Sequence, residues 1–366
     1  MLRVDCVNPL DLTKADIVAW RRMILSQPML SSPYLTPDWA QAVARRRNDA
    51  QVAIFRDGER AVGFLPVQRP GANVAMPIGS PVCDYQALIS PAGAEYDLAQ
   101  AAAALDVGRI DLTAGLKGTA VEGHLQTSDA GHVVCFERGF DAWAAERQAS
   151  GSKIVARARK KFSKLKRDMD NDVCVETFST NVAAYDQLIA WKRAQMHETG
   201  VPDIFAHAWI AGLVRDIFEM PVSAGPEGAF GGAMFVLRVK GKPAAVLFCL
   251  QARDCLHAWF VAHDPALADY SPGQILFIEA IRAAAEEGFR EMDLGPGDYR
   301  FKSSLANASR PIGAGYIGRP SVASAVKAAQ YRVRSVVENL PVGRARAWPA
   351  KAMRRLDIAN GLHAPA

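Results

Sequence analysis

The sequence predicts an α/β (α+β) fold made of two similar halves, each with a mixed sheet and helices on its faces. Three observations support this prediction. The chain contains two β-hairpins of similar pattern, a Ser-Pro step and a helical stretch follow each hairpin, and each series ends in an Asp-Leu-x-x-Gly motif. Features that recur in the same order indicate a duplicated unit.

Each hairpin has the residues that strands and tight turns require. Residues 51–69 and 234–253 are apolar, β-branched runs interrupted by a turn, with Gly58 in the first and Gly241 in the second. Runs of this kind around a glycine turn predict pairs of antiparallel strands.

The spacing after the hairpins supports the duplication. Helices are predicted over about 94–105 and 274–287, and the aspartates of the two motifs are Asp111 and Asp293. These aspartates lie 53 and 52 residues after the turn glycines. No G-x-G-x-x-G motif follows the first strand, and the elements do not alternate strictly, so a Rossmann fold is disfavoured.

A strongly basic segment joins the halves. Residues 153–167 contain eight basic side chains and no acidic one, and Ile154, Ala158, Phe162 and Leu165 recur at helical spacing. The segment therefore predicts an amphipathic helix. Its basic face fits either a solvated linker or a helix that binds phosphate groups.

These features divide the chain into four parts. The expected parts are an N-terminal domain over 1–150, the basic linker helix over 151–167, a C-terminal domain over 168–320 and a basic helical tail over 321–366. In the tail, residues 323–338 predict a helix with an apolar stripe, and Pro341 and Gly343 end it.

The distribution of charge and cysteine excludes several classes of function. The net charge of +5 comes from the tail, which carries +6, while the other 320 residues are nearly neutral. Attraction of the whole surface to nucleic acid is therefore not expected. No apolar run is long enough for a membrane-spanning helix, and the N-terminus does not resemble a signal peptide. The six cysteines form no metal-binding pattern, so they are expected as buried residues of a cytoplasmic protein without a metal.

Three stretches of the second half, together with the basic linker, resemble a known family. They are Trp191–Phe205, His263–Gly273 and Asp293–Lys302. The likeness is to GNAT-type acyltransferases of the CelD-like group, which are associated with cellulose and exopolysaccharide production and are distantly similar to the FemABX aminoacyltransferases. It implies two tandem GNAT-like domains and transfer of an acyl group from an activated donor, with acyl-CoA expected, to an amine.

The sequence departs from ordinary GNAT enzymes at the expected donor site. The Gln/Arg-x-x-Gly-x-Gly/Ala loop is absent, and Tyr270–Gln274 takes its place before a helix. The start of a helix still favours an anion. The candidate donor-binding residues are therefore Ser271, Gly273 and Gln274, with Arg157 and Lys160 on the basic helix.

Acyl transfer needs a neutral amine, a polarised carbonyl and a proton for the leaving group. Asp293 is a candidate for taking the proton of the amine or anchoring the acceptor, or it bonds to turn amides, as Asp111 is expected to do. Lys302 is a candidate for neutralising a donor phosphate or the oxyanion. Tyr299 is a candidate proton donor or stacking group. The candidate acceptor contacts are Asp84, Tyr85, Lys192 and Gln195.

Three functions fit this pattern. The first is an enzyme that transfers an acyl group from acyl-CoA to an amine of a sugar or another cell-envelope or exopolysaccharide precursor. The second is a transferase of FemABX type that uses aminoacyl-tRNA, the one case in which a nucleic acid is a partner. The third is a non-catalytic GNAT-like assembly factor for polysaccharide synthesis. The basic tail adds the expectation of a peripheral contact with an anionic membrane.

Overall fold

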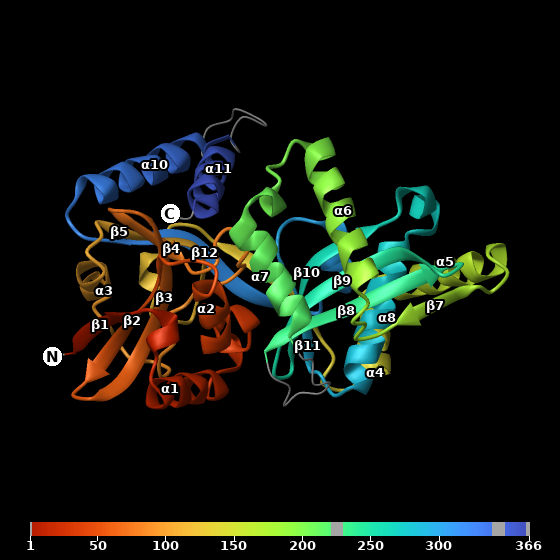
Figure 1. Cartoon of the computed structure of the whole chain (residues 1–366), viewed down its shortest axis with the longest axis horizontal. Coiled ribbons are helices and arrows are strands. Elements are labelled where there is room, and N and C mark those ends of the chain that lie inside the picture. The colour runs from red at the N-terminus through yellow and green to blue at the C-terminus, as the bar shows by residue number, and fades with distance from the viewer. Residues whose placement is uncertain (1, 221–229, 339–347, 364–366) are drawn as a thin grey trace. The chain divides into compact units, whose positions relative to one another are not determined.

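The computed structural model describes residues 2–220, 230–338 and 348–363 (Figure 1). By their internal contacts these residues form two units. Unit 1 consists of Met1–Leu30, Tyr34–Asp129 and Pro311–Ala366, and unit 2 consists of Ser31–Pro33 and Ala130–Arg310. No described helix has the length and apolar character required to span a bilayer.

The strands of unit 1 run in the order β1-β2-β3-β4-β5-β12. They are β1 (Arg3–Val7), β2 (Ala50–Asp57), β3 (Arg60–Gly71), β4 (Val74–Pro77), β5 (Arg109–Leu116) and β12 (Ala308–Gly318). β4 and β5 are parallel, and the other pairs are antiparallel. The first hairpin is thus β2–β3, and its turn contains Gly58 at φ +59°, as expected for a tight turn.

Helices cover both faces of this sheet. The helices are α1 (Lys14–Leu25), α2 (Pro37–Ala44), α3 (Ala99–Ala104), α10 (Val322–Glu338) and α11 (Trp348–Leu362). Trp20 of α1 stacks on Phe64 of β3 with ring centroids 4.8 Å apart. The neighbouring residue Leu65 belongs instead to the cluster that includes Ala101 and Ala102 of α3. Because successive strand residues point to opposite faces, α1 and α3 lie on different sides of the sheet.

The strands of unit 2 run in the order β6-β11-β10-β9-β8-β7. They are β6 (Asp129–Cys135), β7 (Val173–Glu176), β8 (Gly231–Val239), β9 (Lys242–Ala252), β10 (Cys255–His263) and β11 (Glu291–Pro296). β10 and β11 are parallel, and the other pairs are antiparallel. The second hairpin turns at Lys240 and Gly241, both with positive φ, as a two-residue hairpin turn requires.

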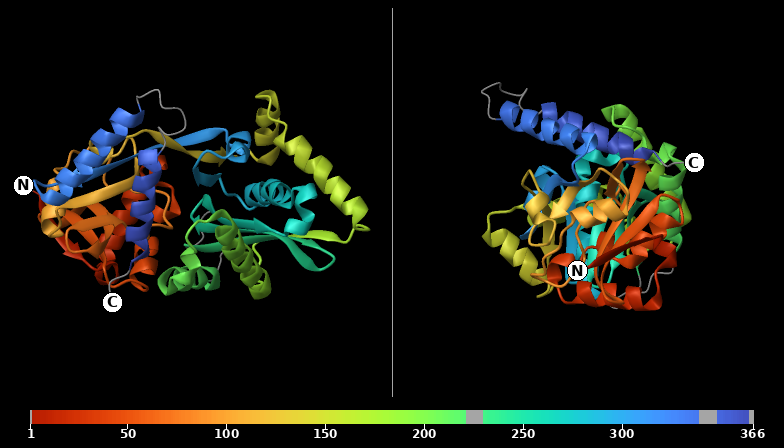
Figure 2. Two further views of the ribbon diagram at one scale, coloured as in Figure 1. Left: turned by 90° about the horizontal axis from the view of Figure 1, so that it is seen from above. Right: turned by 90° about the vertical axis from the view of Figure 1, so that its left-hand side faces the viewer.

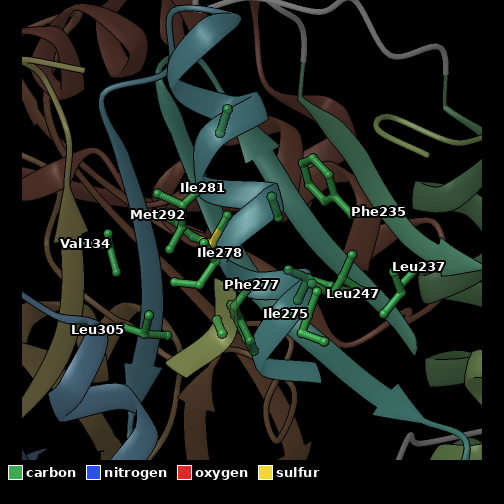
Figure 3. Packing of buried hydrophobic residues seen from close by; sticks show 14 of the residues in the cluster. Val134, Phe235, Leu237, Leu247, Ile275, Phe277, Ile278, Ile281, Met292 and Leu305 are labelled. Atoms are coloured by element: carbon green, nitrogen blue, oxygen red, sulfur yellow. The ribbon is translucent and has the colours of Figure 1, made fainter. Parts of the chain in front are cut away.

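Helices also cover both faces of the second sheet. They are α4 (Phe140–Ala149), α5 (Ile154–Asp168), α6 (Val182–Thr199), α7 (Ala208–Glu219), α8 (Pro272–Glu286) and α9 (Arg300–Leu305). Figure 3 shows Ile275, Ile278 and Ile281 of α8 packed among Phe235, Leu247 and Met292 of the strands. On the other face, Phe248 packs edge-on against Tyr185 of α6 and Phe218 of α7. Each fully buried side chain of this kind contributes about 1.5–3 kcal/mol of transfer free energy.

The order of elements confirms the duplicated α/β architecture. In each repeat a first strand is followed by two helices, a hairpin, a further strand, a helix and a strand parallel to the one before it. Asp111 and Asp293 are both the third residue of that last strand. The predicted helix over 274–287 corresponds to α8, whereas the stretch predicted as 94–105 contains only α3, six residues long.

The units do not follow the expected sequence boundaries of 1–150 and 168–320. β6 comes from the first repeat but pairs with β11 of unit 2, and β12 comes from the second repeat but pairs with β5 of unit 1. The basic helix expected as a linker is α5, and it lies within unit 2. The physical reason is that the closing strand of each repeat forms its hydrogen bonds with a strand of the other repeat. Local sequence carries no signal for such a partner.

The predicted tail helix over 323–338 is confirmed as α10, which packs against the rest of unit 1. Lys327 and Tyr331 are buried, and the Lys327 ammonium lies 3.4 Å from Asp111 Oδ1 and 3.0 Å from Asp357 Oδ1 of α11. Arg47 donates hydrogen bonds to the carbonyl groups of Gly361 and His363. Pro341 and Gly343 lie outside the described residues. Figure 2 shows α10 and α11 in two further views.

Candidate active site

The parallel strands β10 and β11 are paired over only a short stretch. Their ladder holds three residue pairs, from Cys255 with Glu291 to His257 with Asp293. Immediately beyond this point both strands have irregular register with their outer neighbours, β10 between Ala258 and Phe260 and β11 between Asp293 and Gly295. Such bulges redirect backbone groups, and they occur preferentially next to functional sites. The two strands thus diverge where the second Asp-Leu-x-x-Gly motif lies.

Helix α8 begins after β10 at an unusual residue. Ser271 has a left-handed backbone, with φ +54° and ψ +54°, and Pro272 is the first helical residue. Pro272 has no N–H group, and the N–H of Gln274 already donates to the Ser271 carbonyl. Gly273 is therefore the residue of this first turn whose N–H has no partner among the described residues. The turn presents one backbone donor to an anion, fewer than a glycine-rich loop provides.

The basic helix α5 packs beside this turn and beside α8. The Lys161 ammonium donates to the Asp269 carbonyl, and the Lys164 ammonium lies 5.2 Å from the centroid of the Tyr270 ring. The Tyr270 hydroxyl donates to Asp168 at 3.1 Å. These contacts join α5 to the segment that leads into α8. The residues expected on the apolar stripe are buried or half-buried, which leaves the basic side chains outward.

Arg157 and Lys160 both lie on the exposed side of α5. Neither side chain forms a hydrogen bond or an ion pair in the part of the chain that the structure describes. Unpaired basic groups on one helix repel one another, and a bound phosphate relieves that repulsion. The arrangement therefore suits a donor that carries phosphate groups.

Tyr299 and Lys302 come together after β11. The Lys302 ammonium donates to the Pro296 carbonyl at 2.8 Å and lies 5.5 Å from the centroid of the Tyr299 ring. A Cβ atom at Gly297, where φ is +117°, would lie 3.3 Å from that ring. Tyr299 is 61% exposed and Lys302 is half-buried. The glycine turn thus brings a phenol and an ammonium side by side at an accessible place.

Asp293 lies behind this turn and is fully buried. Its Oδ1 accepts from the Gly295 N–H at 2.7 Å, and its Oδ2 accepts from the Arg310 guanidinium at 3.0 Å. The Nδ1 atom of His257 lies 3.6 Å from the same carboxylate. Asp293 is a candidate for taking the proton of the amine, but both of its carboxylate oxygens accept hydrogen bonds from the protein and are buried away from solvent. This geometry favours a role in holding the turn over a role in taking a proton from substrate.

Sequence reasoning did not identify the groups that surround Asp293. Arg310 also donates to Glu291 at 2.9 Å and to the Ser31 hydroxyl at 3.0 Å, and Ser31 donates to Glu291 at 2.6 Å. The sequence does indicate that Glu291 is a neighbour of Asp293, because it lies two residues earlier on the same side of β11. Ser31 and Arg310 are far away in sequence, so no local pattern links them to the motif.

The expected acceptor contacts fall into two groups. Lys192 and Gln195 are brought together on α6, where the Lys192 ammonium donates to the Gln195 amide oxygen at 2.9 Å. Burial lowers the pKa of Lys192 below its ordinary value. Asp84 and Tyr85 belong to unit 1, and Tyr85 is buried. No group of three His, Cys, Asp or Glu side chains suited to a metal ion is found among the described residues.

The second repeat resembles a known family of domains. Residues 152–303 match the model of the acetyltransferase (GNAT) domain family. This range contains α5, β10, α8, β11 and the turn with Tyr299 and Lys302. A search of curated proteins finds no match.

Three solved structures resemble the chain over most of its length. One is a C-terminal DUF2156 domain from Agrobacterium fabrum, assigned to a lysylphosphatidylglycerol synthetase, with 13% identity, coverage of 87% of this chain and 95% of that one, and a TM-score of 0.50. A conserved protein of unknown function from Bacteroides thetaiotaomicron has 10% identity, coverage of 86% and 99%, and a TM-score of 0.52. FemX has 8% identity, coverage of 81% and 93%, and a TM-score of 0.51. At these identities the likeness concerns the fold. The architecture is tandem GNAT-like, because the order of elements in the repeat that contains the GNAT match recurs in the first repeat.

Proposed function

We propose that this chain is an N-acyltransferase, with its active site in unit 2, that uses acyl-CoA as the donor. The acceptor in this proposal is an amine of a sugar or of another cell-envelope or exopolysaccharide precursor, as the resemblance to the CelD-like group implies. The observation that carries the proposal is that the match to the acetyltransferase (GNAT) domain, over 152–303, covers the diverging strands and the exposed Tyr299–Lys302 pair.

The donor fits the charges around the start of α8. Arg157 and Lys160 are exposed cations on the helix that packs beside this turn, and Gly273 offers one N–H. Ser271 and Gln274 complete the candidate donor contacts. Cations replace the backbone donors that an ordinary GNAT loop would supply: a guanidinium such as that of Arg157 binds phosphate bidentately, and an ammonium such as that of Lys160 binds it as a point charge.

The chemistry is a direct transfer. The neutral amine attacks the acyl carbon of the thioester, the carbon–sulfur bond breaks, the nitrogen loses one proton and the departing thiolate gains one. In this proposal the Lys302 ammonium stabilises the negative charge that develops on the carbonyl oxygen. The exposed Tyr299 protonates the thiolate and regains a proton from water, which accepts the one that the nitrogen loses. Asp293 holds the glycine turn that carries both. Lys192, with its lowered pKa, and Gln195 are proposed to contact the acceptor.

Titration calorimetry with acetyl-CoA tests the donor. We expect saturable binding by the native chain and a loss of about 10-fold or more in affinity in the Arg157→Gln/Lys160→Gln variant, since each lost phosphate contact removes about 1 kcal/mol or more. The matched control is Lys240→Gln/Lys242→Gln, which removes two exposed cations from the β8–β9 turn of the same unit. If the native chain does not bind coenzyme A thioesters, the acyl-CoA proposal is wrong.

A second candidate is favoured by the same turn. Because the start of α8 offers only one free N–H, and because α5 is long and cationic, an aminoacyl-tRNA donor fits the exposed face of α5. Filter binding with aminoacyl-tRNA distinguishes the two donors, since binding of tRNA in place of coenzyme A thioesters would favour a FemABX-type reaction. If the chain binds neither aminoacyl-tRNA nor coenzyme A thioesters, the result would favour the non-catalytic assembly factor. A transferase that acts on envelope precursors would work at the cytoplasmic face of a membrane.

A further inference from the structure

Helix α10 has an apolar stripe that faces away from the rest of unit 1. Its members recur at intervals of four, three, four and three residues: Val322, Val326, Ala329, Val333 and Val336. Val322 is 81% exposed, and Val326, Val333 and Val336 are 49%, 58% and 61% exposed. The apolar stripe expected to make the tail amphipathic is thus not the surface by which the helix docks.

The docked side of α10 is held by polar contacts. The buried ammonium of Lys327 is within ion-pair distance of both Asp111 and Asp357, and Arg109 donates to the Ala323 carbonyl at 2.7 Å. Turning the helix to bury the valines would separate Lys327 from Asp357 and Asp111 and would leave only Arg109 beside Asp111, at a high desolvation cost. The valine stripe therefore stays outward in the folded chain.

Basic side chains border this stripe and continue onto α11, which packs against α10. On α10, Arg332 lies three residues after Ala329 and four before Val336, beside the stripe. On α11 the exposed cations are Lys351, Arg354 and Arg355, together with Trp348 at 73% and Leu356 at 53% exposure. None of these four cations forms an ion pair among the described residues. The two acids of these helices, Glu338 and Asp357, are already paired with Arg334 and Lys327.

We propose that the exposed faces of α10 and α11 bind the surface of an anionic lipid bilayer. Apolar side chains, an exposed tryptophan and unpaired cations on two adjacent helices match the boundary between acyl chains and acidic headgroups. The charge argues against a second copy of the chain, because the cations of both copies would repel one another. The stripe is also only about two heptads long, shorter than a stable coiled coil requires.

Flotation with vesicles tests the proposal through lipid binding alone, without reference to transferase activity. The full chain should bind vesicles of 70% phosphatidylcholine and 30% phosphatidylglycerol and should dissociate from them at high salt. It should not bind vesicles of pure phosphatidylcholine. Lys351→Gln/Arg354→Gln/Arg355→Gln should weaken binding by about 10²-fold, since each cation near such a surface contributes roughly a factor of five. Val326→Gln/Val333→Gln/Val336→Gln should weaken it by about 10-fold through lost apolar burial.

Two matched controls make the result specific to this surface. Val18→Gln/Leu25→Gln removes apolar side chains of similar exposure, 55% and 60%, from α1 of the same unit. Arg159→Gln/Lys160→Gln/Lys164→Gln removes three cations from α5. Both controls should bind vesicles as the native chain does, and circular dichroism should show native folding in every variant. Loss of binding only in the α5 variant, native binding by both tail variants, or a dimer that the valine variant abolishes would overturn the proposal.

Discussion

Asp111 and Asp293 occupy equivalent places in the two repeats, but their surroundings differ. Only Asp293 lies beside the candidate active site. Both are buried third residues of a strand parallel to its predecessor, and both carboxylates are held by arginine. Asp111 is also covered by Lys327 of the tail, whereas Asp293 holds the Gly295 turn. The shared feature is a buried ion pair, and from it we infer a structural role for the Asp-Leu motif in both repeats.

The elements around the two aspartates explain why the candidate site lies in one unit only. In unit 2 the preceding strand β10 is nine residues long with a bulge, and α8 is 15 residues long. In unit 1 the corresponding β4 has four residues and α3 has six. After Asp111 the strand β5 continues to Leu116, with no counterpart of the Tyr299–Lys302 turn. Both units thus have the sheet, but only unit 2 has the long strand and the long helix that precede the candidate site.

The largest expected effect concerns the residue present in only one repeat. Lys302→Ala should lower kcat/KM for acyl transfer by about 10²-fold, mostly through kcat, because the ammonium is proposed to act in the transition state. The measurement is thiol release from the acyl-CoA donor. Lys117→Ala is the control, since Lys117 follows β5 of unit 1 and its ammonium donates to the Ser128 hydroxyl at 2.9 Å. Near-native turnover in the Lys302 variant would remove it from the site.

The two aspartates give the sharpest test of the comparison. Asp293→Asn and Asp111→Asn should each lower the free energy of unfolding by about 3 kcal/mol, because each leaves a buried cation short of its carboxylate. Only Asp293→Asn should also lower transfer by about 10²-fold, through displacement of the turn that carries Tyr299 and Lys302. Urea unfolding and turnover are measured on the same samples. An equal loss of activity in both variants would show that the comparison of framework and site is wrong.

The duplicated fold was predictable because its signals are local. Hairpin turns at Gly58 and Gly241, helix periodicity and the spacing to Asp111 and Asp293 are properties of short segments. The exchange of pairing partners by β6 and β12 was not predictable, because the sequence of a closing strand does not indicate the strand with which it pairs. The tail helix over 323–338 was predicted, but the face it buries was not, since docking uses the charged Lys327 in place of the valine stripe.

The candidate site was predictable only in part, for the same reason. Tyr299 and Lys302 are close in sequence, so a glycine turn brings them together whatever the rest of the chain does. The partner of Asp293 is Arg310, 17 residues away on the next strand, and this distance concealed the burial of the carboxylate. The placement of α5, which carries Arg157 and Lys160, beside α8 likewise depends on packing between helices distant in sequence.

A smaller effect is expected from the cation that covers Asp111. Lys327→Met should lower the free energy of unfolding by about 2–3 kcal/mol, because Asp111 and Asp357 lose a shared buried partner. Acyl transfer per folded molecule should be unchanged, since the proposed active site lies in unit 2 and Lys327 belongs to unit 1. The control is Arg334→Met on the same helix, whose pair with Glu338 is closer to solvent and contributes about 1 kcal/mol or less. Equal losses in the two variants would show that Lys327 has no special role in docking the tail.

The smallest expected effect is a pH dependence of opposite sign at two acids of unit 1. Burial raises the pKa of Asp357, with Lys327 opposing and Asp111 adding to the shift. At Asp16, burial acts in the same direction, but hydrogen bonds from Arg56 and Thr13 and the charge of Arg56 outweigh it and lower the pKa. A raised pKa in the folded state stabilises at low pH, and this contribution is lost as pH rises through that pKa. A lowered pKa stabilises above the ordinary value of about 3.9 and is lost as pH falls.

Urea unfolding from about pH 3 to 6 therefore separates the two acids. Relative to Asp357→Asn, the native chain should lose stability as the pH rises across this range. Relative to Asp16→Asn, it should gain stability over the same range. If both comparisons had the same sign, the carboxylate of Asp357 would be held as firmly by Lys327 as Asp16 is by Arg56. The tail would then dock on Asp111 through a fully ionised network, and its contact with unit 1 would strengthen with rising pH in place of weakening.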